Sequence, residues 1–235
     1  MLREQFAGAN KSSTSFLSPL ERRMASVVLP KIPSFLETHH LTMLSLVWCA
    51  LVVAFSYLAQ EDVRWLWGVS SMIALQYVTD FFDGKVGKYR DTGLVKWGFY
   101  MDHLLDYVFL CSLVIGYAFV LPVGSLYYLL LTLAVFGGFM VNSFLSFGAT
   151  GKFNISHLRF GPTEFRIALI IINSLLVLFG LKHMTKVLPY VPVFALLGLS
   201  IVVYRTHKKI WRIDMALKEG MKDERVGTKE KKLVR

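Results

Sequence analysis

Residues 80–106 read DFFDGKVGKYRDTGLVKWGFYMDHLLD and place four aspartates at the facing ends of two apolar segments. Asp80 and Asp83 are three residues apart, and Asp102 and Asp106 are four apart, so each pair lies on one face of a helix. A carboxylate inside a bilayer costs about 2.5–3.5 kcal/mol. A membrane chain keeps such groups when a partner neutralises them. We call these four residues the acidic quartet.

The acidic quartet is a candidate metal site. Two pairs of carboxylates on the two arms of a helical hairpin form an oxygen-rich site of the kind that hard divalent cations prefer. Two ions held about 3.5–4 Å apart would suit phosphoryl chemistry.

The composition indicates a membrane protein. Of the 235 residues, 54% are hydrophobic and the mean hydropathy is +0.50, more apolar than a soluble domain requires. The formal charge of +10 favours anionic lipid headgroups as partners and not nucleic acid. Cys49 and Cys111 both lie in apolar segments, where they fill the core and do not form a disulfide framework.

Six apolar segments each have close to the ~20 residues that a helix needs to cross a bilayer. They are Leu41–Ala59, Val63–Phe82, Gly98–Leu121, Ser125–Phe147, Glu164–Leu181 and Val187–Tyr204. A short amphipathic helix is predicted to begin at Ser18, to lie in the membrane interface, and to end before Pro30 and Pro33. The predicted fold is an all-α integral membrane protein with six transmembrane helices preceded by an interfacial amphipathic helix.

Three regions follow from this pattern: a disordered N-terminus with the interfacial helix (1–40), a six-helix membrane domain (41–204) and a basic cytoplasmic tail (205–235). In the tail, Ile210, Ile213, Leu217 and Met221 recur at helical spacing. The last span therefore either continues as a surface helix on anionic lipid or is followed by a solvated basic segment that only sets the orientation.

The basic residues predict the orientation. Of the 26 lysine and arginine residues, 23 lie in residues 1–40, 84–97, 149–166 and 205–235, whereas the other loops hold Arg64, Lys182 and Lys186. The positive-inside rule then places both termini and the acidic quartet in the cytoplasm, at the inner membrane if the source is bacterial. Both termini on one side require an even number of spans, in agreement with six.

The central stretch resembles the signature of the CDP-alcohol phosphotransferase (CDP-alcohol phosphatidyltransferase) family: D-x-x-D-G-x-x-A-R, eight residues, then G-x-x-x-D-x-x-x-D. Asp80, Asp83 and Gly84 match its first part, and Gly98, Asp102 and Asp106 match its last part. Two departures stand out. Gly87-Lys88 replaces Ala-Arg, and nine residues instead of eight precede Gly98. Since a lysine lacks the bidentate fork of arginine, Arg90 is a candidate substitute in phosphate binding.

The resemblance implies an enzyme of phospholipid biosynthesis. A substituted phosphate group would pass from a CDP-alcohol, such as CDP-diacylglycerol or a CDP-amino alcohol, to a hydroxyl acceptor, with release of CMP. It implies two Mg²⁺ or Mn²⁺ ions, contact with membrane lipids, and a homodimer. Two alternatives stay open: a divalent-cation transporter that uses the same carboxylates, and a catalytically silent relative.

The resemblance also implies roles for individual residues. Asp106 would be the general base, and the whole acidic quartet would ligate metal. The nucleotide would contact Asp80, Asp83, Gly84, Gly87 and Lys88. The acceptor would contact Arg159, Arg166 and His103. Gly98 would let two helices approach closely.

Overall fold

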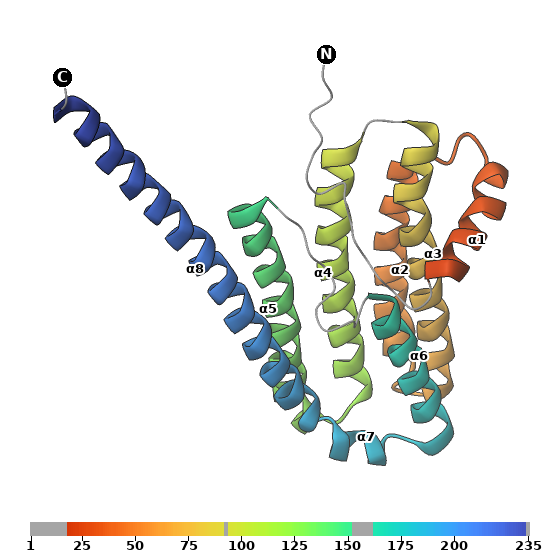
Figure 1. Cartoon of the computed structure of the whole chain (residues 1–235). Helices are drawn as coiled ribbons and strands as arrows, with labels where there is room; N and C mark the ends of the chain where they lie inside the picture. The colour runs from red at the N-terminus through yellow and green to blue at the C-terminus, as the bar shows by residue number, and fades with distance from the viewer. Residues whose placement is uncertain (1–17, 92–93, 152–161, 234–235) are drawn as a thin grey trace.

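The structure, a computed structural model, describes residues 18–91, 94–151 and 162–233, and every regular element in these ranges is helical (Figure 1). The helices are α1 (Ser18–Val28), α2 (Thr38–Leu58), α3 (Leu66–Arg90), α4 (Val95–Val120), α5 (Leu126–Thr150), α6 (Pro162–Phe179), α7 (Lys182–Val187) and α8 (Tyr190–Leu233). Short 3-10 turns are η2 (Leu29–Lys31), η3 (Val63–Trp65) and η4 (Val123–Ser125).

Each of the six predicted apolar segments falls in a long helix, in chain order α2, α3, α4, α5, α6 and α8. Two helices run further than expected. Helix α3 continues past Phe82 to Arg90 and ends where Asp91 takes a left-handed conformation, with a φ of 52°. Helix α8 continues to Leu233, so the last apolar segment and most of the basic tail form one helix.

By length and composition, four stretches of the described residues can cross a membrane. They are Thr38–Leu58, Val95–Val120, Val123–Thr150 and Met184–Met221. Helix α3, whose second half carries Asp80, Asp83 and Lys85, is not among them, and neither is α6. The chain is thus an all-helical, multi-pass membrane protein. The count of six spans and the interfacial position of α1 stay predictions.

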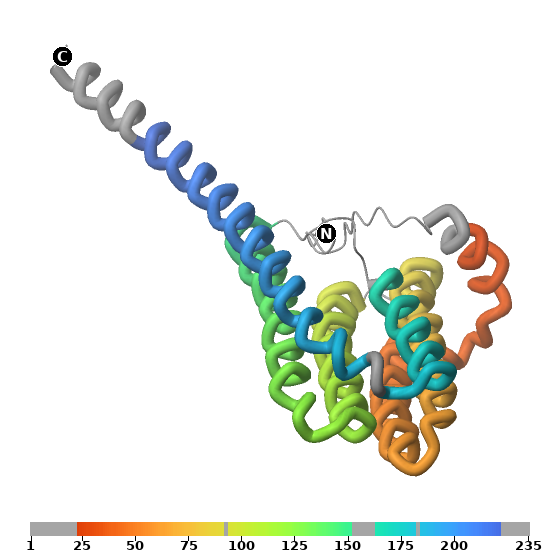
Figure 2. The backbone as a smooth tube through the Cα atoms, turned by 90° about the horizontal axis from the view of Figure 1, so that it is seen from below, coloured from red at the N-terminus to blue at the C-terminus, as the bar shows by residue number. Residues whose placement is uncertain are grey.

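The helices form one bundle with a projecting arm. Helix α2 packs against both α3 and α4, and α6 packs against α3. Helix α5 contacts α4 on one side and α8 on the other. Figure 2 shows α8 extending well beyond the remaining helices. The acidic residues of α3 and α4 therefore lie within the α2–α3–α4–α6 group and not on the arm.

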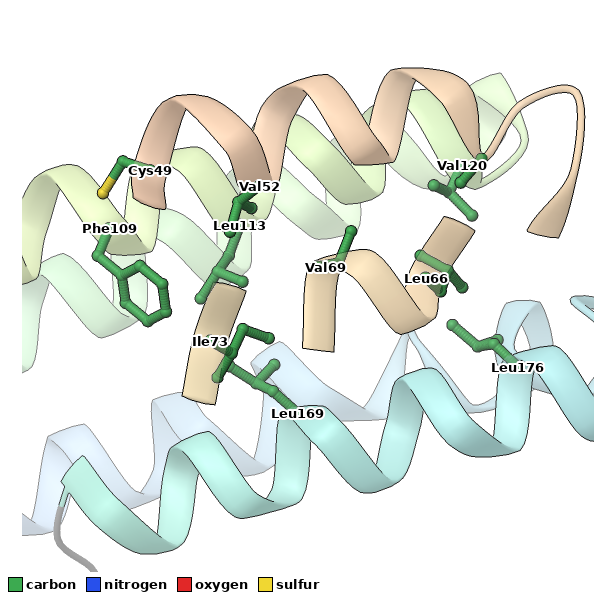
Figure 3. Close-up of a cluster of buried hydrophobic side chains, with 11 residues drawn as sticks. Cys49, Val52, Leu66, Val69, Ile73, Phe109, Leu113, Val120, Leu169 and Leu176 are labelled. Carbon is green, nitrogen blue, oxygen red and sulfur yellow. The ribbon is translucent and has the colours of Figure 1, made fainter. Parts of the chain in front are cut away.

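An apolar core joins these four helices. Figure 3 shows side chains from α2, α3, α4 and α6 meeting in one cluster, with Ile73 of α3 beside Leu169 of α6. The fully buried members on α2 and α3 include Val52 and Ile73, at 0% exposure. This cluster lies on the same face of α3 as Asp80 and Asp83, since positions 73, 76, 80 and 83 follow helical spacing. The core therefore fixes the face on which the carboxylates stand.

Helices α2 and α4 approach closely at Gly116. A Cβ atom added there would stand 2.5 Å from Ser56 Oγ and 3.0 Å from Ser56 Cβ. Small residues at such crossings let helix backbones pack tightly inside a membrane. At Gly98, in contrast, an added Cβ would meet no described atom within 4 Å. The expectation that Gly98 lets two helices close up is wrong, because it lies in the first turn of α4, where α3 and α4 barely touch.

A buried polar network ties three helices together below the acidic residues. Tyr117 of α4 donates its hydroxyl to Asn173 Oδ1 at 2.7 Å, and Asn173 Nδ2 of α6 donates to Ser70 Oγ of α3 at 3.1 Å. Asn173 is completely buried. Because the polar atoms satisfy one another, the network holds α6 in register against α3 and α4.

Candidate active site

Two members of the acidic quartet meet at one arginine. Arg166 Nη2 of α6 donates to Asp80 Oδ2 of α3 at 3.0 Å and to Asp106 Oδ1 of α4 at 3.3 Å. The Arg166 side chain is only 6% exposed, whereas those of Asp80 and Asp106 are 21% and 31% exposed. These are charge-assisted hydrogen bonds in a mostly desolvated place, where they are stronger than at a surface. A single guanidinium thus joins three helices.

Aromatic rings flank this guanidinium. Its central carbon is 5.8 Å from the centre of the Tyr77 ring and 5.9 Å from that of Phe109. Both separations are within the range of a cation–π contact. The rings add to the attraction of the two carboxylates and help to offset the cost of burying a charge.

Asp83 stands one turn further along α3 and is held by α2. Its Oδ2 accepts a hydrogen bond from Thr42 Oγ1 at 2.9 Å, and its Oδ1 accepts one from the backbone N–H of Gly84. Asp83 is buried, and Asp80 and Asp102 are near enough to interact with it electrostatically. All four carboxylates therefore gather in one region, between the end of α3 and the beginning of α4.

The acidic quartet does not stand in metal-binding geometry in this structure. Among the described residues, no three His, Cys, Asp or Glu side chains are close enough together to hold a metal ion. The Arg166 guanidinium lies between Asp80 and Asp106 and contacts both carboxylates. The donor chemistry nevertheless fits Mg²⁺ or Mn²⁺, because four carboxylates supply only hard oxygen ligands.

The residues expected at the nucleotide lie along the last turns of α3. Gly84 is exposed, and a Cβ added there would meet no described atom within 4 Å. Lys88 is also exposed, and the carbonyl of Gly87 accepts the N–H of Asp91 that closes the helix. Open space therefore adjoins Asp83 at Gly84.

Arg90 does not replace the missing family arginine. Its Nη1 donates to the carbonyls of Leu36 at 2.8 Å and Ser34 at 3.3 Å. Its Nη2 donates to those of Ile32 at 3.0 Å and Pro33 at 2.9 Å. With both terminal nitrogens engaged by backbone, Arg90 fastens the segment before α2 to the end of α3.

The three residues expected at the acceptor are placed differently. Arg159 lies outside the described residues. Arg166 faces Asp80 and Asp106, as given above. His103 is buried on a neighbouring face of α4: its Nδ1 is 2.6 Å from the Phe99 carbonyl and 3.6 Å from Asp102 Oδ2, and its ring packs against Phe144 of α5.

Two buried polar side chains beside the acidic quartet were not predicted. Thr42 is the partner of Asp83. Gln76, one helical turn before Asp80, is 1% exposed, and its Oε1 has no hydrogen-bond partner among the described residues. Each is a polar residue inside an apolar segment, and that signal could have singled them out.

The comparisons with known proteins agree with this arrangement. The family model described as CDP-alcohol phosphatidyltransferase matches residues 38–204, which include α2 through the first part of α8 and the whole acidic quartet. No curated protein and no solved structure gave a match. A family match over most of the chain, together with four converging carboxylates at the expected positions, leads to one assignment. The chain belongs to the CDP-alcohol phosphatidyltransferase family.

Proposed function

We propose that this protein transfers a substituted phosphate group from a CDP-alcohol to a hydroxyl acceptor and releases CMP, in phospholipid biosynthesis. The donor is a CDP-linked lipid or alcohol, such as CDP-diacylglycerol or a CDP-amino alcohol. The observation that carries the proposal is the convergence of Asp80 and Asp106, from two different helices, on one buried cation at Arg166. A bundle that buries this much charge in an apolar setting does so for chemistry, because a structural role would cost less with apolar side chains.

In this proposal Asp80, Asp83, Asp102 and Asp106 hold the divalent cations. When bound, Mg²⁺ or Mn²⁺ would offset the negative charge of the diphosphate and of the departing CMP. The nucleotide lies along the last turns of α3, beside Asp80, Asp83, Gly84, Gly87 and Lys88. The open space at Gly84 supports this placement.

Asp106 acts as the general base. It takes the proton from the acceptor hydroxyl while that oxygen forms a bond to the phosphorus that carries the substituent. The bond from this phosphorus to the oxygen of CMP breaks, and CMP leaves with the bonding electron pair. Of the two carboxylates that contact Arg166, Asp106 is the more exposed, at 31% against 21% for Asp80. An acceptor therefore reaches Asp106 more easily than Asp80.

The reaction takes place at the cytoplasmic face of the membrane. The excess of lysine and arginine in residues 1–40, 84–97, 149–166 and 205–235 supports this orientation. Six spans, an interfacial α1 and a lipid-bound basic tail complete the proposal. The exposed, positively charged residues of α8, such as Lys208, Lys209 and Arg212, favour anionic headgroups.

The test is CMP release from CDP-diacylglycerol or a CDP-amino alcohol by the purified full-length protein, with Mn²⁺ and a panel of acceptor alcohols. Asp106→Asn should abolish turnover while the protein stays folded. Asp62→Asn is the matched control: Asp62 forms an ion pair with Arg64 just before α3, and Asp80 lies about 21 Å along that helix from its first residue. Full activity of Asp106→Asn would refute the base assignment. Absence of CMP release with every acceptor would refute the proposed reaction.

A further inference from the structure

We propose that Arg166 is a resident cation of the active site, which takes the place of a divalent metal ion at Asp80 and Asp106 and gives up these contacts when the metal binds. The inference rests on the proposed metal-dependent function and concerns the regulation of the same site. In this proposal a metal ion and the Arg166 side chain compete for the same two carboxylates, and this competition sets the affinity for metal.

The contacts identify the competition. One nitrogen, Nη2, reaches carboxylate oxygens on two helices, at 3.0 and 3.3 Å. A guanidinium and a divalent cation held by the same two carboxylates would lie within a few ångströms of each other. In a desolvated site their repulsion is strong, because the effective dielectric constant is low. The guanidinium and the metal ion therefore cannot bind Asp80 and Asp106 at the same time.

Arg166 also offsets part of the negative charge that the acidic quartet places inside the bundle. Without a positive charge among them, four neighbouring carboxylates would repel one another inside the bundle. Arg166 neutralises part of that charge and joins α3, α4 and α6. The absence, among the described residues, of any three acidic or other ligating side chains at metal-holding distance agrees with a site that is held by the arginine.

The surroundings offer the displaced side chain another position. The rings of Tyr77 and Phe109 lie 5.8 and 5.9 Å from the guanidinium carbon, so a movement toward either ring would keep the charge beside an aromatic face. The exchange therefore needs a change of side-chain rotamers and leaves the packing of α6 against α3 in place.

The test is a titration of Mn²⁺ into the metal-stripped, full-length protein in detergent, without substrate, with free Mn²⁺ measured by electron paramagnetic resonance. Arg166→Gln should bind Mn²⁺ at least about tenfold more tightly than the wild type, which corresponds to about 1.4 kcal/mol. Arg166→Lys should fall between them, because it keeps the positive charge, but its ammonium nitrogen is one bond nearer the backbone than Nη2 and reaches the two carboxylates less well. Arg64→Gln is the matched control, an exposed arginine paired with Asp62 just before α3, and should bind as the wild type does.

Wild-type binding with equal or weaker binding by Arg166→Gln would overturn the inference and leave the proposed function intact. An absence of Mn²⁺ binding by every variant would overturn both. Thermal unfolding gives an independent readout: Mn²⁺ should raise the melting temperature of Arg166→Gln more than that of the wild type, and an equal rise would count against the competition. If Arg166→Gln does not fold, Arg166→Lys decides by the same two measurements.

Discussion

Thr42→Val should weaken the active-site region by removing one hydrogen bond without changing the shape of the side chain. The Thr42 hydroxyl has a single proton and two acceptors at 2.9 Å, the carbonyl of Thr38 and Asp83 Oδ2. The carbonyl of Thr38 still accepts a backbone N–H within α2 after the hydroxyl is removed, so the loss of this second donor has little effect there. Asp83 Oδ2 loses its side-chain donor while it is buried, at 8% exposure.

The magnitude follows from the burial of the acceptor. A buried acceptor that loses its donor costs about 1–3 kcal/mol, and more if the acceptor is charged. We expect Thr42→Val to lower the free energy of unfolding by about 1–3 kcal/mol, measured by denaturant titration in detergent micelles. Thr42→Ser, which keeps the hydroxyl, should lower the free energy of unfolding by less than Thr42→Val does.

Thr132→Val supplies the matched control for this prediction. Thr132 is partly exposed, and its hydroxyl donates to the carbonyl of Tyr128 in its own helix, at 2.7 Å. Its replacement should change the free energy of unfolding by no more than about 0.5 kcal/mol. The reasoning is refuted if Thr42→Val costs no more than Thr132→Val, or if Thr42→Ser costs as much as Thr42→Val.

Three further predictions concern the packing around the site. Arg90→Ala removes the donors to four backbone carbonyls and should increase amide hydrogen exchange in residues 32–36; unchanged exchange would show that the segment does not depend on Arg90. Gly116→Ala should lower the free energy of unfolding by about 1–3 kcal/mol, because the added methyl group pushes α2 away from α4. Adding Ser56→Ala to this variant should recover part of the loss. Equal stability of the single and double variants would contradict the clash. Tyr117→Phe should lower the free energy of unfolding by about 1–2 kcal/mol in the wild-type protein, but by almost nothing in a protein that already carries Asn173→Leu. Additive losses in this double-mutant cycle would contradict the network.

The helices could be predicted from the sequence because each apolar segment is long and carries few charged residues. Their ends were less predictable. Helix α3 runs on to Arg90 through Gly84 and Gly87, two glycines that normally weaken a helix, since the residues around them are held by Thr42 and by the segment before α2. Helix α8 continues through the basic tail, where the hydropathy falls but the helical spacing of apolar residues persists.

The acidic quartet could be predicted because its spacing is local, whereas its partners are remote in sequence. Arg166 is 86 residues from Asp80 and 60 from Asp106, and no periodicity within α6 indicates that it faces carboxylates. Thr42 is 41 residues from Asp83. A signal was present there: buried small or polar residues recur at helical spacing on α2, at Thr38, Thr42, Ser45, Cys49 and Ser56. Such a stripe indicates a packed interface, but it does not tell which carboxylate it meets.

The most direct measurement is an experimental structure of the full-length protein with Mn²⁺, in which anomalous scattering locates the metal. We expect anomalous peaks among Asp80, Asp83, Asp102 and Asp106, with the Arg166 guanidinium withdrawn from Asp80 and Asp106. A structure with no manganese at these carboxylates, and with Arg166 still bridging two of them at saturating Mn²⁺, would contradict the proposal that the acidic quartet is the metal centre of a phosphotransferase.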